Sequence, residues 1–236
     1  MLPAGFRLLP SFRAVLNCLG LAAALFLFSS PGFAAPSPDQ ADQPPDAWEL
    51  KWALQSASSD VRTAMSWVMQ RRDNQGQPFA IVDKKSAALF IFSADGQLRG
   101  MSAALLGLTP GDHAASPDDA SVPEQLGKAD RTTPAGRFVS EPGRNLQGER
   151  IVWVDYVSRL AIHRLRPAPL FERRAERLAS ATPDDNRISL GCVVVPAEFY
   201  DQVVAPVLGI SYGVVYVLPE NQGLRELLGT LQLGLH

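Results

Sequence analysis

From Pro78 onward, short apolar runs alternate with residues that favour turns, and this pattern restricts the chain to a sheet-rich fold. The stretch FAIVDKKSAALFIFSADGQL, residues 79–98, predicts a strand, a turn, a second strand and a hairpin turn at its Asp-Gly pair. The stretches GRFVSEP, RIVWVDYVSRLAIHRL and VVYVLP predict further strands as far as Pro219. We therefore expect residues 75–220 to form one β-rich α+β domain, with a mixed sheet arranged as a sandwich or barrel.

Helical spacing of apolar residues occurs at three places around these strands. Residues 47–74 predict an N-terminal helical segment, in which Ser58 offers a cap before the second half. Residues 170–179 and 197–208 show the same spacing. We expect these helices to lie at the periphery of the sheet.

The N-terminus has the layout of a secretory signal peptide. Arg7 and Arg13 precede or begin the largely apolar run Ala14–Phe28, and small residues lead to a cleavage site after Ala34. The run is shorter than the roughly 20 residues that a membrane span needs. We expect residues 1–34 to be removed during export across the inner membrane, which places the protein in the periplasm or cell wall. An uncleaved anchor is the alternative.

Polar segments separate and follow these parts. Residues 35–46 are rich in proline and aspartate and predict a flexible linker, and residues 112–130 predict a long loop. Residues 221–236 are expected to form a C-terminal tail. The chain has a net charge of −2, which removal of the leader makes more negative, so no basic surface for nucleic acid is expected. No later segment is apolar enough to predict a membrane span.

Cysteine content singles out one thiol. The chain has two cysteines, and only Cys192 remains once the leader is removed. A lone cysteine cannot form an internal disulfide in an oxidising compartment. It lies in RISLGCVVVP, residues 187–196, which reads as a buried strand. Cys192 is therefore an ordinary core residue, one half of an intermolecular disulfide, or a nucleophile, and a nucleophilic thiol needs a base nearby.

Three histidines could supply that base: His113 in a loop, His163 at the end of a predicted strand, and the terminal His236. A histidine where a strand meets a loop can be presented to a cleft, which favours His163; a structural, hydrogen-bonded histidine is the alternative. The chain has neither C-x-x-C nor H-x-x-x-H spacing, so a zinc site is not expected. We expect no metal and no cofactor.

Three sequence elements together resemble one known family. His163, the downstream SLGC stretch that ends at Cys192, and the upstream TTPAGRF at residues 132–138 resemble the L,D-transpeptidase catalytic domain of the YkuD type. That family carries a histidine, a variable gap, then Ser/Thr-x-Gly-Cys, preceded by a TPxGxF-like stretch. The resemblance covers roughly residues 78–219 and implies a β-rich catalytic domain that acts on peptidoglycan.

The resemblance implies a function in cell wall biogenesis and cell shape. Cys192 is implied as the nucleophile that attacks a stem-peptide carbonyl, and His163 as general base and acid. The backbone carbonyl of Arg164 is implied to orient the histidine ring, and the N–H of Gly191 to bind the oxyanion. Peptidoglycan stem peptides are the implied partners, and carbapenems the implied acylating compounds.

The sequence departs from the family pattern beside the cysteine and before it. Val194 stands where the family has Arg or Asn, and the His–Cys gap is lengthened by LFERRAERLAS. We expect Ser189 and Arg187 to contact substrate, with Arg187 or an arginine of the insertion replacing the missing polar group. The inserted helix is expected to act as a lid or wall, or to be a solvated face. Transfer to an amine is expected; an L,D-carboxypeptidase or crosslink hydrolase, and a non-catalytic wall-binding module, are the alternatives.

Overall fold

The computed structural model describes residues 47–113 and 131–233, and all of them belong to one compact unit. The predicted signal peptide 1–34 and linker 35–46 lie outside the described residues, as does most of the predicted loop 112–130. In the described part of the chain, no helix is long and apolar enough to cross a membrane.

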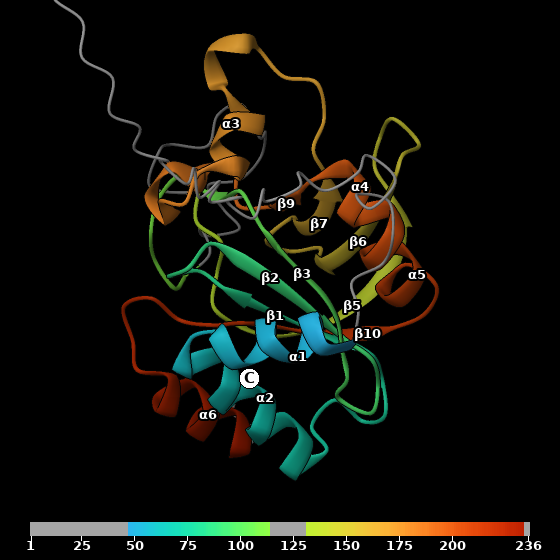
Figure 1. The fold of residues 1–236 in the computed structure, drawn as a ribbon, viewed down its shortest axis with the longest axis vertical. Helices are drawn as coiled ribbons and strands as arrows, with labels where there is room; N and C mark the ends of the chain where they lie inside the picture. The colour runs from blue at the N-terminus through green and yellow to red at the C-terminus, as the bar shows by residue number, and fades with distance from the viewer. Residues whose placement is uncertain (1–46, 114–130, 234–236) are drawn as a thin grey trace, which may run out of the picture. The chain divides into compact units, whose positions relative to one another are not determined.

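An eight-stranded mixed sheet forms the centre of the fold, with the strand order β3-β2-β1-β10-β5-β6-β7-β9 (Figure 1). The pairs β1–β10 and β7–β9 are parallel, and the other neighbours are antiparallel. The strands are β1 (Phe79–Asp83), β2 (Ala88–Phe92), β3 (Leu98–Ala103), β5 (Gly136–Arg144), β6 (Arg150–Asp155), β7 (Leu160–Arg164), β9 (Val193–Val195) and β10 (Gly213–Val217). A short parallel pair, β4 (Leu106–Gly107) and β8 (Arg187–Ser189), lies in a separate two-stranded sheet.

The sheet curls until its two edge strands come together. The first half of β5 pairs with β10 and the second half with β6, so β5 joins the two halves of the sheet. Leu105, just after edge strand β3, exchanges backbone hydrogen bonds of 2.7 and 2.9 Å with Val194 in edge strand β9. The fold is thus barrel-like and rich in strands, with a few helices, as the sequence predicted.

Apolar side chains from alternate strand positions fill the inside of the curl, among them Val82, Leu89, Ile162 and Val195. The predicted helix at 197–208 packs into this core through Tyr200, Val204 and Leu208. It consists of α4 (Ala197–Phe199), a π-helical turn (Tyr200–Val204) and α5 (Ala205–Leu208).

A second apolar layer covers the outer face of β1, β2 and β10. Figure 1 shows α1 (Ala47–Ser56), α2 (Ser59–Arg71) and α6 (Leu224–Gln232) together on this side of the sheet. The expected cap is present, because the Ser58 side chain accepts a hydrogen bond from the Val61 N–H at 3.2 Å. The range 221–236, expected to be a tail, contains helix α6, because Leu224 and Leu228 are buried in this layer.

Two predicted elements are interrupted. The stretch 187–196 is not one strand: β8 ends at Ser189 and β9 begins at Val193, with Gly191 between them at a φ of +126°. The stretch 170–179 is a 3₁₀ turn (Leu170–Glu172) followed by α3 (Arg174–Ala179). Arg173, at a φ of +49°, breaks it, since the left-handed region cannot continue a right-handed helix.

Candidate active site

Strand register brings His163 and Cys192 to one face of the sheet. In the parallel pair β7–β9, Ile162 lies beside Val193 and His163 beside Val194. Ile162 and Val193 point into the inner core, so His163 points outward, and so does Cys192, one residue before Val193. The two functional candidates are diagonal neighbours on adjacent strands, with Cα atoms about 8 Å apart by strand spacing and rise.

The His163 ring is held in one orientation by the backbone. Its Nδ1 lies 2.8 Å from the carbonyl oxygen of Arg164, and because a carbonyl only accepts, Nδ1 carries the proton. Nε2 is therefore left with a lone pair, which is the state that a general base needs. This contact is the one that the family resemblance implies for Arg164; the catalytic roles of both residues stay predictions.

The Arg164 side chain points away from the face of β7 that carries the His163 ring. Its guanidinium is 5.2 Å from the ring centre of Tyr200, which belongs to the inner core, and 2.7 Å from Asp201. It also lies near Glu149, which in turn pairs with Arg166 at 2.6 Å. The bulk of Arg164 therefore lies on the opposite face of β7 from the His163 ring.

The Cys192 thiol sits against the turn between β6 and β7. Sγ donates to the Arg159 carbonyl at 3.5 Å, and the residue is half-buried and not disulfide-bonded. Among the described residues, no hydrogen bond joins this thiol to the His163 ring; a base–nucleophile hydrogen bond often forms only when substrate is bound. The pair is on one face but not yet in contact.

Charge states of the two groups are set mainly by burial. Desolvation lowers the pKa of His163 to about 4, and the positive charges of Arg166 and Arg174 act in the same direction. Desolvation raises the pKa of the Cys192 thiol. A hydrogen bond from the Ala161 N–H and the charge of Arg166 lower it by less. At neutral pH both groups are therefore uncharged, and no thiolate–imidazolium pair stands preformed.

This resting state predicts the pH dependence of thiol alkylation. Because the thiol pKa is raised above its ordinary value of 9.0, the iodoacetamide reaction rate of Cys192 should climb through neutral pH and level off only above pH 9. Mass spectrometry of the Cys192 peptide after timed labelling measures it. A rate plateau beginning below pH 7 would instead mean a preformed ion pair with His163.

Hydrogen bonds from two side chains, Ser189 and Thr133, hold the loop that carries the thiol. The Ser189 hydroxyl donates to the Cys192 carbonyl at 2.6 Å and accepts from the Gly191 N–H at 3.1 Å. A Cβ on Gly191 would lie 2.9 Å from the Thr132 carbonyl oxygen, so the close approach and the φ of +126° both call for glycine. Ser189 is buried, and its hydroxyl holds the turn by accepting the Gly191 N–H. The predicted contact of Ser189 with substrate and the predicted oxyanion role of Gly191 stay predictions.

Thr133 of the TTPAGRF stretch is the second side chain that holds this loop. Its buried hydroxyl donates to the Gly191 carbonyl at 2.7 Å and accepts from the Gly107 N–H at 2.9 Å. In the sequence Thr133 is only one position of the TTPAGRF motif, whereas the structure shows that its hydroxyl links this motif to the cysteine loop.

Thr133→Val should therefore weaken the fold by roughly 1–3 kcal/mol, since it leaves a buried N–H and a buried carbonyl without their partner. The free energy of urea unfolding measures this. Thr63→Val on the exposed side of α2 is the control and should change it by under about 0.5 kcal/mol. Equal losses of unfolding free energy for the two variants would contradict the role of Thr133 in holding the loop.

Arg187 lies in a different, buried charge cluster. Its guanidinium pairs with Glu220 and donates to the Lys84 carbonyl at 2.8 Å. The Lys84 ammonium, fully buried, contacts Asp112 at 2.9 Å and the Thr133 carbonyl at 3.0 Å. The predicted contact of Arg187 with substrate stays a prediction. In the structure this side chain binds Glu220 and the Lys84 carbonyl. His113 is exposed, and nothing in the described residues joins it to His163 or Cys192.

Sequence reasoning missed this cluster of Lys84, Asp112, Glu220 and Arg187. Asp112 also accepts the N–H groups of Glu220, Asn221 and Gln222, at 2.7 to 2.9 Å. The one available signal was a lysine directly after the buried strand FAIVD, and its partners are distant in sequence.

The inserted segment borders the same face. Leu178 and Val194 are buried together with Leu105, and Cys192 packs partly against this group. Val194 is thus part of a small apolar core rather than a substrate contact. Beside it, residues 165–170 and 173–176 line a pocket of about 370 Å³.

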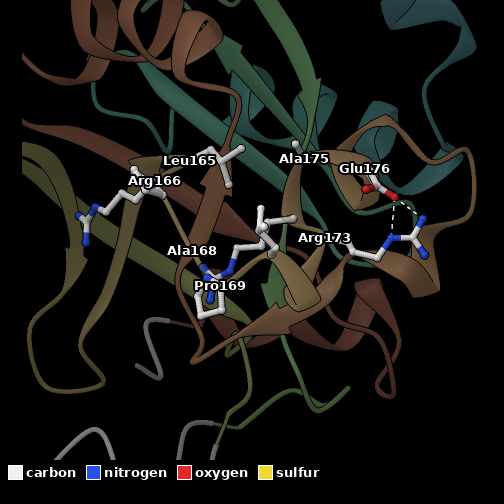
Figure 2. A pocket seen from close by; sticks show the side chains of 10 residues that line it. Leu165, Arg166, Ala168, Pro169, Arg173, Ala175 and Glu176 are labelled. Atoms are coloured by element: carbon white, nitrogen blue, oxygen red, sulfur yellow. Dashed lines mark hydrogen bonds and ion pairs between the residues drawn. The ribbon is translucent and has the colours of Figure 1, made fainter.

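Figure 2 shows Arg166 and Arg173 pointing away from each other across this pocket, with Arg173 paired to Glu176. The arginines therefore do not converge on one anion. The expected role of the segment as a lid or wall stays a prediction. In the described part of the chain, no group of three or more His, Cys, Asp or Glu is placed to hold a metal ion.

Comparison with known proteins gives structural neighbours but no sequence match. No protein-family model and no curated protein matches the chain. The NMR structure of the catalytic domain from the E. faecium L,D-transpeptidase is similar at 16% sequence identity, covering 61% of this chain and 98% of that one, with a TM-score of 0.36. At this level the neighbour assigns neither a family nor an activity to this chain.

Proposed function

We propose that this protein is a peptidoglycan L,D-transpeptidase that works through a Cys192 acyl-enzyme, after export to the periplasm or cell wall. One observation carries the proposal. His163 and Cys192 lie on the same face of adjacent strands, and Arg164 fixes the ring so that Nε2 carries the lone pair. The His…SLGC and TTPAGRF resemblance supplies the substrate class.

The reaction begins with proton transfer from the thiol to Nε2 of His163 as Sγ attacks the stem-peptide carbonyl carbon. The carbonyl becomes an oxyanion held by backbone N–H groups of the Cys192 loop, for which the Gly191 N–H would exchange the Ser189 hydroxyl for the oxyanion. Its collapse breaks the peptide bond, and the departing D-residue amine takes the proton from His163. A thioester on Cys192 remains.

Transfer is completed by the amine of a second stem peptide. The amine attacks the thioester carbon, gives a proton to His163, and expels the Cys192 sulfur, which recovers that proton. The uncharged resting pair suits this cycle, since His163 starts each half as a base and ends it as an acid.

Product analysis of purified tetrapeptide muropeptides by mass spectrometry tests the proposal. Crosslinked dimers with release of the terminal D-residue are expected. Tripeptide monomers alone would mean that water is the acceptor and the protein is a carboxypeptidase. Unchanged substrate, with Cys192 also unreactive toward a carbapenem, would mean a non-catalytic wall-binding protein.

A further inference from the structure

The outward face that carries Cys192 continues across three more strands. Extending the β7–β9 register by one residue places Cys192 beside Ala161. Ala161 pairs with Trp153 in β6, and Trp153 pairs with Glu141 in β5. Side chains at paired positions share a face, so Cys192, Ala161, Trp153 and Glu141 form one row. Ala161 lies between Cys192 and Trp153 in this row.

Trp153, the third member of this row, forms an aromatic platform with Tyr156. Their ring centres lie 4.6 Å apart with 29° between the planes, and Tyr156 is 56% exposed. A Cβ on Gly143 would lie 2.4 Å from Cδ1 of Trp153, so this glycine allows the indole to lie flat on β5. Large aromatic rings left in contact with solvent beside a reactive thiol are candidates for ligand binding.

Glu141 gives the platform a polar edge. Its carboxylate forms no ion pair with any other described residue, whereas the neighbouring arginine Arg137 is paired with Asp73. Burial, and then the hydrogen bond to Glu141 and its negative charge, raise the pKa of the Tyr156 hydroxyl, so the carboxylate lies beside that ring. A carboxylate has more acceptor positions than the one that the Tyr156 hydroxyl uses, and an apolar ring face beside such a carboxylate suits a pyranose, which has C–H groups on its faces and hydroxyls on its rim.

The distance from the thiol also favours a sugar. Two strand spacings separate the Cα atoms of Cys192 and Trp153, which is about 10 Å. In a tetrapeptide donor cleaved after its third residue, three residues separate the scissile bond from the sugar. Three extended residues span about 10 Å. The platform therefore lies about where the stem peptide joins its glycan.

We propose that Trp153, Tyr156 and Glu141 bind the amino sugar that carries the donor stem peptide. The inference rests on the proposed function for the identity of the ligand. It assigns this surface a specificity role: the sugar stacks on the aromatic pair, and Glu141 accepts hydrogen bonds from its hydroxyls.

Calorimetric binding to the inactive Cys192→Ala protein tests the proposal without any turnover. Two ligands are compared, a disaccharide tetrapeptide and the same tetrapeptide without sugar. The disaccharide form should bind about tenfold more tightly, and adding Trp153→Ala should remove that preference while leaving affinity for the free tetrapeptide unchanged. Trp52→Ala, at a 66% exposed tryptophan of α1, is the matched control and should keep the preference.

Tyr156→Ala provides a second variant in an exposed turn, in case Trp153→Ala does not fold. Equal affinity for the two ligands, or a preference that survives both substitutions, overturns the proposal. So does failure of both ligands to bind. The proposed function is decided separately, by the products that the unmodified protein makes.

Discussion

Replacing Cys192 by alanine is expected to abolish conversion of tetrapeptide muropeptides, a loss of about 10⁴-fold or more, because no other described side chain can form the thioester. Cys192 is half-buried; its thiol makes a weak hydrogen bond to the Arg159 carbonyl and packs partly against Leu105, Leu178 and Val194, contacts that are each small. Its removal should therefore cost little stability. Product formation is measured by chromatography and mass spectrometry.

The control for this loss is Ser211→Ala, an exposed position before β10, which should keep full turnover. Urea unfolding of Cys192→Ala should show a folded protein, so that the loss is chemical. Turnover within tenfold of the unmodified protein would remove Cys192 from the mechanism, whatever the rest of the site does.

Lys84→Met should cause the largest loss of stability, about 3–5 kcal/mol in the free energy of urea unfolding. The Lys84 ammonium is fully buried, and its removal leaves the carboxylates of Asp112 and Glu220 without this cation. The same contacts hold the Thr133 carbonyl, and Thr133 holds the cysteine loop. Activity should therefore fall together with stability.

The adjacent residue supplies the matched control. Lys85 pairs with Asp60 at 3.0 Å, but its side chain is 49% exposed, so Lys85→Met should cost under about 1 kcal/mol. Adding Asp112→Asn to Lys84→Met should recover part of the loss, because it removes one uncompensated charge. Equal losses for Lys84→Met and Lys85→Met would contradict the buried cluster.

Acid should loosen the same cluster. Burial opposes ionisation of Asp112, but hydrogen bonds from the N–H groups of Glu220, Gln222 and Asn221 and from Lys84 lower its pKa to about 2. A carboxyl with a depressed pKa contributes stability above its ordinary value of 3.8, and that stability is lost as the pH falls toward 2. The cluster, and the cysteine loop that it supports, should therefore lose stability only in acid, as the pH falls from about 3.8 toward 2.

Local patterns in the sequence were enough for the strands, whereas the candidate pair also needed the family resemblance. Alternating apolar residues and an Asp95–Gly96 turn predicted β1 to β3. A histidine at a strand end and one remaining cysteine suggested His163 and Cys192, and the order of the His, SLGC and TTPAGRF elements selected them. The Ser58 cap followed from its position before helical spacing. These features depend on neighbours a few residues apart.

Features that depend on register or on distant partners could not be predicted. The four charged residues of the Lys84 cluster come from four separate segments, and no local pattern indicates their contact. The break at Gly191 follows from the Thr132 backbone, which meets it only in the folded chain. The row from Cys192 to Trp153 requires the pairing of three strands.

The central claim, a covalent intermediate on Cys192, is tested most directly by intact-mass measurement after rapid acid quench. The protein is mixed with a tetrapeptide donor, quenched within its first turnovers, and digested to locate the adduct. The expected result is a mass increase equal to the donor minus its terminal D-residue, on the peptide that contains Cys192, and no such adduct in Cys192→Ala. An adduct on another residue, or product formation without any adduct on Cys192, would contradict the mechanism.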